Sequence, residues 1–192
     1  MAKSIHSSAL QRVLFDPLAY LHPRRLLLPV DLTEQAAARS AVNSLLISVF
    51  QMRHDCDDAQ LDPLARQWLR HWHRLPQTAY LIGCHALRAD LAWRAGQLIL
   101  PEWALTFTTI ALPTEAASRQ NIPGHDAILR AGYGRLQPWR ARLPVPLAQR
   151  LPLLFPPHVD SVASQQGADP LILTLALQHA QRHTHPIPAD AH

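Results

Sequence analysis

The sequence has few of the residues on which most enzymes and cofactor-binding proteins depend. Its 192 residues include three glutamates, six glycines, two cysteines and a single lysine. The glycines form no GxGxxG, GxxxxGK[ST] or GxSxG pattern, so the usual phosphate-cradling loops and the nucleophile elbow are missing. Glu34, Glu102 and Glu115 each fall in the first turn of a predicted helix, where the helix dipole accounts for them. These shortages predict a non-enzymatic protein without a cofactor.

The chain also lacks a long hydrophobic run. A membrane-spanning helix needs about 20 consecutive apolar residues, and the best candidate, residues 79–101, is interrupted by two arginines and an aspartate. No apolar stretch and small-residue cleavage site follow the N-terminus, so we expect no signal peptide. Cys56 and Cys84 fit neither a CxxC nor a zinc spacing, which favours reduced thiols. We expect a cytoplasmic protein that does not insert into a membrane.

Positive charge comes almost entirely from arginine, and the formal net charge is +4. This charge raises a basic helical nucleic-acid-binding regulator as an alternative function. A helical nucleic-acid binder needs its arginines on one face, whereas these are scattered along the chain. Five arginines with two aromatic neighbours come closest to such a patch: Arg130, Arg135, Arg140, Arg142 and Arg150, with Tyr133 and Trp139. An ordinary solvated surface explains the same residues, and we expect no nucleic-acid partner.

Apolar residues recur at helical spacing along most of the chain, and no convincing strand-like alternation occurs. Asp31 opens a predicted helix with one apolar stripe that we expect to be buried: Val42, Leu45, Leu46, Val49 and Phe50. Asp62 and Pro63 start the next helix with an N-cap and a first-turn proline, and Trp68 and Trp72 lie on its core stripe. The longest predicted helix covers residues 77–100 and, being apolar on two sides, is expected to be central.

Further predicted helices open at Pro101, Pro113, His125 and Asp169. Residues 138–157 contain six prolines but are too apolar for a solvated linker, which predicts an extended strap with one or two helical turns near residues 145–151. We therefore predict an all-α fold, an irregular single-domain bundle of about seven helices with a proline-rich strap. The domain is expected to cover residues 1–183, and residues 184–192 are expected to be a disordered tail.

Three histidines near the end of the last predicted helix are candidate metal ligands. His179 and His183 are four residues apart and share a helix face, and His185 follows. No glutamate follows the first histidine as in HExxH, and histidine at a helix C-terminus interacts favourably with the helix dipole. We expect no metal site. A small cytosolic enzyme is the less favoured alternative, because no catalytic set accompanies these histidines.

Two segments about ninety residues apart carry a family resemblance. They are FDPLAYLHP at residues 15–23 and LPTEAASR at residues 112–119, accompanied by the central helix around residues 87–96 and the run RLP at residues 142–144. With them the chain resembles the small cytosolic adaptors of bacterial type III secretion machines, the YscK/PscK/SctK/OrgA family.

The resemblance implies a mostly α-helical, non-enzymatic linker that works at the cytosolic face of the inner membrane. It implies two partners: the cytoplasmic domain of the inner-membrane ring protein and the C-ring-like pod protein of the sorting platform, beneath the export ATPase complex. It also implies a role in protein transport and virulence through protein–protein interaction.

Candidate partner-binding residues lie in the first signature and among the tryptophans. Phe15, Leu18 and Leu21 recur at three-residue spacing, so we expect them to anchor to the core and to leave the charged residues toward solvent. Two prolines stiffen the segment, and a rigid segment loses little entropy on docking. That the segment only caps the bundle is an equally open interpretation. Tryptophans near arginines are enriched in binding sites. The predicted partner-binding residues are Asp16, His22, Arg24, Arg25, Trp93 and Trp139.

Overall fold

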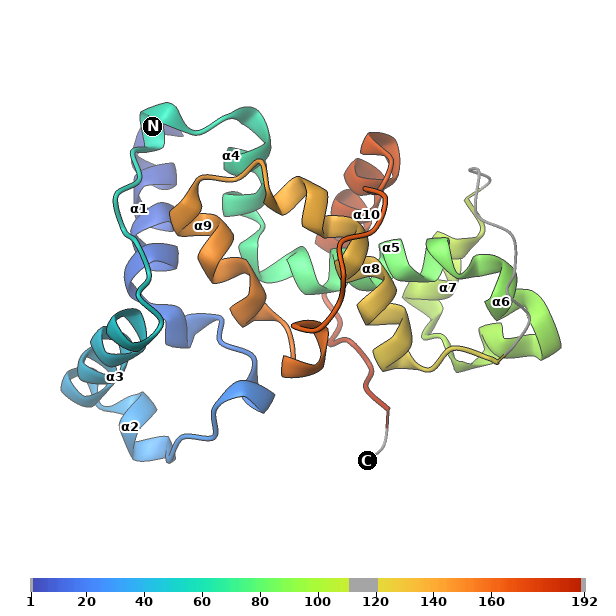
Figure 1. Cartoon of the computed structure of the whole chain (residues 1–192), viewed down its shortest axis with the longest axis horizontal. Helices are drawn as coiled ribbons and strands as arrows, with labels where there is room; N and C mark the ends of the chain where they lie inside the picture. Colours follow the sequence, from blue (N-terminus) through green and yellow to red (C-terminus); the bar gives the residue numbers. More distant parts are fainter. Residues whose placement is uncertain (1, 111–120, 191–192) are drawn as a thin grey trace. The chain divides into compact units, whose positions relative to one another are not determined.

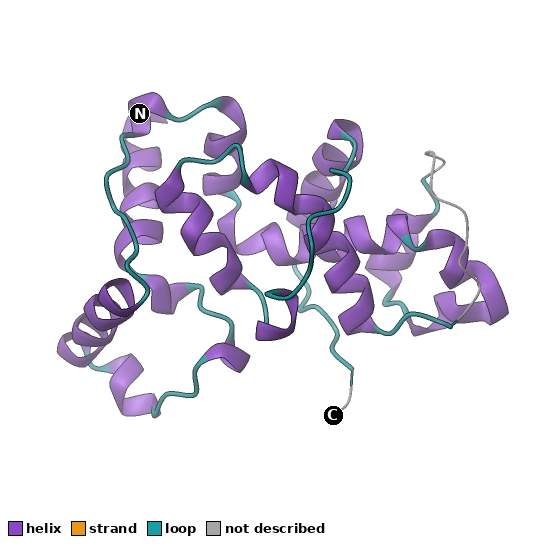
Figure 2. Ribbon diagram, in the orientation of Figure 1, coloured by secondary structure: helices purple, strands orange, loops and turns teal. Residues whose placement is uncertain are grey.

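The computed structural model describes residues 2–110 and 121–190, and within these ranges every regular element is a helix (Figures 1 and 2). The structure is 69% helical, with ten α-helices and several short 3-10 helices in the described part of the chain. The all-α prediction is confirmed. The predicted helix opening at Pro113, and with it the LPTEAASR segment, lies outside the described residues.

The chain divides into two compact units. Unit 1 consists of residues 1–73 and 140–160, and unit 2 consists of residues 74–139 and 161–192. Unit 1 is therefore built from two separate pieces of chain, and most of unit 2 lies between them in the sequence. The prediction of one domain over residues 1–183 with a disordered tail stays a prediction.

In unit 1, α1 packs against α3, α4 and α9. The α-helices of this unit are α1 (Ala2–Phe15), α2 (Val30–Glu34), α3 (Ala36–Val49), α4 (Pro63–Arg70) and α9 (Val145–Arg150). Its 3-10 helices are η1 (Pro17–Ala19), η2 (Pro23–Arg25), η3 (Asp58–Gln60), η6 (Leu151–Leu154) and η7 (Pro157–Val159). A further 3-10 turn, η4 (Trp72–Arg74), begins in the last residues of the first piece of this unit and ends at Arg74, the first residue of unit 2.

The start and the core stripe of α4 agree with the prediction. Asp62 is the N-cap, and its Oδ1 accepts a hydrogen bond of 2.6 Å from the Ala65 amide, which satisfies one of the unpaired N–H groups of the first turn. Pro63 occupies the first helical position, where no N–H is needed. Trp68 in α4 and Trp72 in the following turn η4 are buried, so the prediction that both belong to the core is confirmed.

The helix predicted from Asp31 is present in two pieces, and its predicted buried stripe is wrong. The backbone of Gln35 is extended, with ψ of 120°, and separates α2 from α3. Of the five stripe residues, Leu46 alone is buried, and three are more than half exposed: Leu45, Val49 and Phe50. The inner face of α3 includes the polar Asn43 instead, because its side chain makes hydrogen bonds within the unit.

In unit 2, α5 is central, as predicted for the region after Pro76. Ten of its twelve residues are buried, and it contacts α6, α7 and α10. The elements of this unit are α5 (Leu75–Ala86), α6 (Arg88–Ala92), η5 (Trp93–Ile99), α7 (Glu102–Thr108), α8 (His125–Arg140) and α10 (Pro170–Arg182). Asp169 caps α10, and its side chain accepts a hydrogen bond of 2.7 Å from the Leu171 amide.

The predicted continuous helix over residues 77–100 is wrong. The α5 helix ends at Ala86, and the chain continues through the short helix α6 into the 3-10 turns of η5. Ala95 has φ of 58°, in the left-handed region that residues other than glycine rarely adopt. Ile122 packs against Gly96, where an added Cβ would lie 2.8 Å from its side chain. Apolar spacing alone did not reveal these breaks, because no proline marks them.

Two glycines allow α5 and α8 to cross in close contact. A Cβ added at Gly83 would lie 1.9 Å from the carbonyl oxygen of Ile128, and one at Gly132 would lie 1.7 Å from that of Ala79. Both distances are far shorter than any non-bonded contact, so a side chain at either position would force the two helices apart. This crossing places α8 directly against the central helix of unit 2.

The proline-rich segment consists of short helices rather than extended chain. It includes the end of α8, the predicted turns near residue 145, now α9, and the 3-10 helix η6. Pro146 and Pro152 stand at the first or second position of α9 and η6, where the missing N–H costs no helical hydrogen bond. Its apolar side chains contribute to the core of unit 1: Leu143, Leu147, Leu151, Leu153, Leu154 and Phe155.

Candidate partner-binding site

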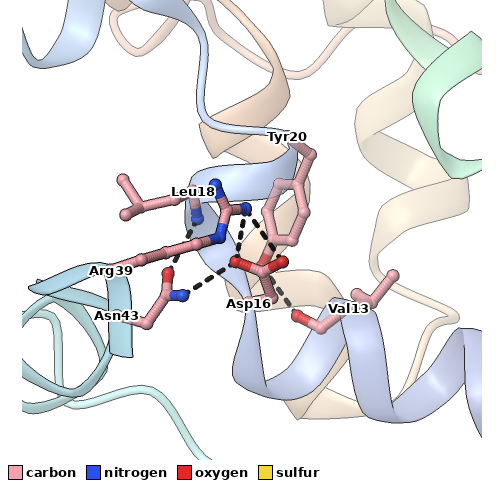
Figure 3. Close-up of polar contacts among 6 residues, drawn as sticks. All are labelled: Val13, Asp16, Leu18, Tyr20, Arg39 and Asn43. Carbon is pink, nitrogen blue, oxygen red and sulfur yellow. Dashed lines mark hydrogen bonds and ion pairs between the residues drawn. The ribbon is translucent and has the colours of Figure 1, made fainter. Parts of the chain in front are cut away.

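Asp16 is the centre of a polar cluster that joins the end of α1 to α3 (Figure 3). Its carboxylate accepts hydrogen bonds of 2.8 and 2.9 Å from the Arg39 guanidinium and one of 2.7 Å from the Asn43 amide. The Asn43 Oδ1 in turn accepts a hydrogen bond of 3.0 Å from the Leu18 amide. Asp16 and Arg39 are each about one-third exposed. The predicted site residue Asp16 therefore has a structural role within unit 1.

Tyr20 is the buried anchor of the first signature (Figure 3). Its hydroxyl donates a hydrogen bond of 2.8 Å to the Val13 carbonyl oxygen, and its ring meets Trp72 edge-on at 5.9 Å. Burial raises the pKa of Tyr20, so the hydroxyl remains a donor at neutral pH. Phe15 was expected to be an anchor, but it is 46% exposed, so this part of the prediction is wrong.

His22 is the N-cap of the 3-10 turn η2 and links this turn to the proline-rich segment. Its amide donates a hydrogen bond of 2.8 Å to the Leu153 carbonyl oxygen. Its Nδ1 accepts one of 3.1 Å from the Arg24 amide, which caps the turn. Arg24 is exposed. Of the four charged or polar candidates in this segment, Arg24 agrees best with the expected orientation toward solvent.

Arg25 is held by its own unit, and its expected orientation toward solvent is wrong. Its Nε donates a hydrogen bond of 2.6 Å to the Phe155 carbonyl oxygen. Its two terminal nitrogens bind both oxygens of Asp160 at 2.8 and 2.6 Å, the bidentate geometry for which the guanidinium is suited. The Arg25 side chain is 14% exposed. The first signature thus fastens unit 1 together, which supports the structural interpretation of it.

Arg150 is a buried cation of unit 1, although the sequence pattern predicts it in a surface patch. Its side chain is fully buried and donates hydrogen bonds to the carbonyl oxygens of Arg53 at 2.5 Å, Pro146 at 2.9 Å and Leu14 at 2.7 Å. Leu14 lies in the last turn of α1, where carbonyl oxygens lack helical partners and carry partial negative charge. Burial lowers the pKa of Arg150 from its ordinary value, and the group stays charged.

The two candidate tryptophans both lie in unit 2, whereas the other four candidates lie in unit 1. Trp139 is near the end of α8, and its Nε1 donates a hydrogen bond of 3.0 Å to the Ala168 carbonyl oxygen. Trp93 begins η5. Each is partly exposed. That any of the six candidates contacts a partner stays a prediction.

The three histidines near the end of α10 contact aromatic residues of the same unit. His179 donates a hydrogen bond of 2.6 Å to the Trp103 carbonyl oxygen, and its ring lies 4.4 Å from that of His183. His185 stacks on Trp103. Burial lowers the pKa of His179, which favours the neutral imidazole at neutral pH. Among the described residues, no group of three or more histidine, cysteine or acidic side chains is arranged to hold a metal.

Both cysteines are free thiols. Cys84 is buried in α5, and burial raises its pKa, so it is protonated at neutral pH. A protonated thiol is a poor nucleophile. Tyr80 lies one turn earlier, and its hydroxyl is 2.8 Å from His125 Nδ1. Burial raises the pKa of Tyr80 as well, so its hydroxyl stays protonated at neutral pH.

These contacts define an all-α protein in which the polar side chains of Asp16, Arg25 and Arg150 hold helices in place. Within the described ranges, no helix has both the length and the hydropathy to cross a bilayer. Residues 10–182 match the family described as bacterial type III secretion apparatus protein (OrgA_MxiK), and the chain belongs to this family. The family resemblance noted in the sequence is confirmed.

Two relatives match over nearly the whole chain. The chain is 41% identical to oxygen-regulated invasion protein OrgA of Salmonella typhimurium over 181 residues, which cover 94% of this chain and 91% of OrgA. It is 26% identical to protein MxiK of Shigella flexneri over 176 residues, covering 89% of this chain and 87% of MxiK. No solved structure gives a significant match.

Proposed function

We propose that this chain is a non-enzymatic cytosolic adaptor of a type III secretion machine. In this role it works at the cytosolic face of the inner membrane and links two components. One is the cytoplasmic domain of the inner-membrane ring protein, and the other is the C-ring-like pod protein of the sorting platform. The observation that carries the proposal is the family match over residues 10–182.

The fold supports an adaptor in two further ways. Each of the two units has a core of its own. The polar cluster around Asp16 holds helices in place and provides no catalytic group. A pre-organised surface loses little conformational entropy when a partner binds. The net charge of +4 favours acidic partners, with long-range attraction raising the association rate more than the affinity.

A three-component binding experiment tests the proposal. The purified ring-protein cytoplasmic domain is immobilised, and the pod protein is passed over it with and without this chain. We expect the pod protein to be retained only when the chain is present, and the association rate to fall as salt rises. A pod protein retained equally well without the chain, or a chain that binds neither component, contradicts the proposal.

A further inference from the structure

Unit 1 carries an apolar groove on the outer face of α3, which we call the α3 groove. Its volume is about 420 Å³. Seven of its lining residues are apolar and one is charged: Leu21, Leu26, Leu45, Leu46, Val49, Phe50, Pro157 and Arg25. The groove lies wholly within unit 1. It contains four of the five residues that the hydrophobic pattern had assigned to the core, all except Val42.

Several apolar side chains of the α3 groove are unusually exposed, which indicates that a partner covers them. Leu45, Val49 and Phe50 are 61, 66 and 54% exposed, while Leu46 forms the buried floor beside them. Leu45 and Val49 are four residues apart, so they lie one above the other along the helix. Contiguous exposed apolar side chains on a folded protein mark interaction sites more often than scattered single ones.

Both walls of the groove are fixed before anything binds. The α3 wall is held by the hydrogen bonds of Arg39 and Asn43 to Asp16. The opposite wall is held by Arg25, through its hydrogen bond to the Phe155 carbonyl oxygen and its ion pair with Asp160. A rigid groove of this kind needs little reorganisation to accept a partner.

The charge of the groove restricts the chemistry of its occupant. The guanidinium of Arg25, the one charged lining residue, is paired with the Asp160 carboxylate. Its alkyl stem can then contribute apolar surface while the charged head stays on its carboxylate. The lining therefore offers apolar surface without uncompensated charge, and an uncharged, apolar face complements it.

The size of the groove favours one helix over a second copy of this chain. A stable dimer buries about 800 Å² on each partner, contributed by roughly 20–30 residues a side. The α3 groove has eight lining residues. Amphipathic helices that bind in grooves place a few apolar anchors at i, i+3 or i+4, and i+7. That arrangement fits a short groove along one helix.

We propose that the α3 groove binds an amphipathic helix of a partner protein, which inserts apolar side chains from one of its faces between α3 and the wall formed by Leu21, Arg25 and Leu26. The inference rests on the proposed function, because the partners tested for this helix are the two components named there.

The test uses the full chain with the double substitution Leu45→Gln and Val49→Gln. Both side chains are exposed, so the double variant is expected to fold, which circular dichroism and a thermal melt verify. The matched control is Val145→Gln, which changes an apolar side chain that is 49% exposed in the same unit but outside the groove. Calorimetric titrations measure the affinity of each variant for the purified ring-protein domain and for the purified pod protein.

We expect the double variant to bind one of the two proteins at least about tenfold more weakly, as for truncation of central interface residues. The other protein is expected to bind it as it binds the wild type, and Val145→Gln is expected to bind both unchanged. A photo-crosslinking amino acid in place of Phe50 is expected to mark a single helix of the affected partner.

Three results overturn the inference. The first is unchanged affinity of the double variant for both proteins while the wild type binds them, which leaves the proposed function intact. The second is a crosslink from position 50 to a second copy or to the same chain. The third is a wild-type chain that binds neither protein, which overturns the proposed function together with this occupant.

Discussion

Replacing Arg150 by methionine tests whether a buried cation holds unit 1 together. Methionine has a similar length and no charge, so it retains much of the packing and removes every donor. Three carbonyl oxygens lose their partner: those of Leu14, Pro146 and Arg53. The Arg53 residue is exposed, so water can replace the donor there. The Leu14 carbonyl belongs to a buried residue and has no such replacement.

The magnitude follows from these three bonds. Hydrogen bonds to a charged group contribute about 1.5–3 kcal/mol each, and a buried group left without a partner costs about 1–3 kcal/mol. Against this loss, the variant no longer has to bury a guanidinium. We expect the two inner bonds to dominate and the free energy of unfolding to fall by about 2–4 kcal/mol. For a chain of this length the melting temperature then falls by about 4–16 °C.

Thermal melts followed by circular dichroism measure the effect. Arg12→Met is the matched control, because Arg12 is an exposed arginine of α1 in the same unit. Its loss removes a favourable contact with the helix dipole, worth less than about 1 kcal/mol. An Arg150→Met variant that melts at or above the wild-type temperature refutes the reasoning, because the desolvation penalty of the guanidinium would then exceed the value of its hydrogen bonds.

Three further predictions concern other contacts. Gly132→Ala places a methyl group against the Ala79 carbonyl oxygen and is expected to lower the free energy of unfolding by at least about 3 kcal/mol. In the control Gly167→Ala the added Cβ would meet its nearest atom at 3.4 Å, so no loss of stability is expected. Equal melting temperatures of the two variants would contradict the α5–α8 crossing. Arg25→Met is expected to cost about 1–2 kcal/mol and Arg24→Met under about 0.5 kcal/mol; a larger loss from the exposed residue would reverse the assignment. Because burial lowers the pKa of His179, the unfolded chain binds the proton more readily, so the free energy of unfolding falls as pH drops through about 6.5. We expect His179→Gln to make the free energy of unfolding less dependent on pH in this range. An unchanged pH dependence would count against a buried neutral imidazole.

Local signals in the sequence were enough to place several helix starts. Asp62 and Asp169 cap α4 and α10 through hydrogen bonds to amides two or three residues ahead, so the information needed is contained in a few neighbouring residues. The same holds for α9, where Pro144 is the N-cap residue and Pro146 occupies a first-turn position. The all-α class followed from apolar spacing, because helices supply most of the buried surface.

Tertiary contacts decided what the sequence could not. The spacing of α3 predicted a buried stripe, but the helix is oriented by the bonds of Arg39 and Asn43 to Asp16, which lies 23 and 27 residues away. Two of the three partners of Arg150 lie even further away in the sequence, Arg53 by 97 residues and Leu14 by 136. A lone arginine in a row of scattered arginines gives no sign that it is buried. Both pairings require knowledge of the fold.

The division of unit 1 into two pieces of chain has a consequence for how the protein is made. Residues 1–73 leave the ribosome well before residues 140–160, which supply Arg150 for α1 and Asp160 for Arg25. At a synthesis rate of about 5–20 residues per second, the first piece waits roughly 4–17 s for the second. During this interval the end of α1 lacks its cation and the apolar residues of α1 lack α9, so the nascent chain presents apolar surface of the kind that chaperones bind. Most of unit 2 lies between the two pieces in the sequence, so its first helices can form and pack in that time. Unit 1 completes its fold only after residue 160 has emerged.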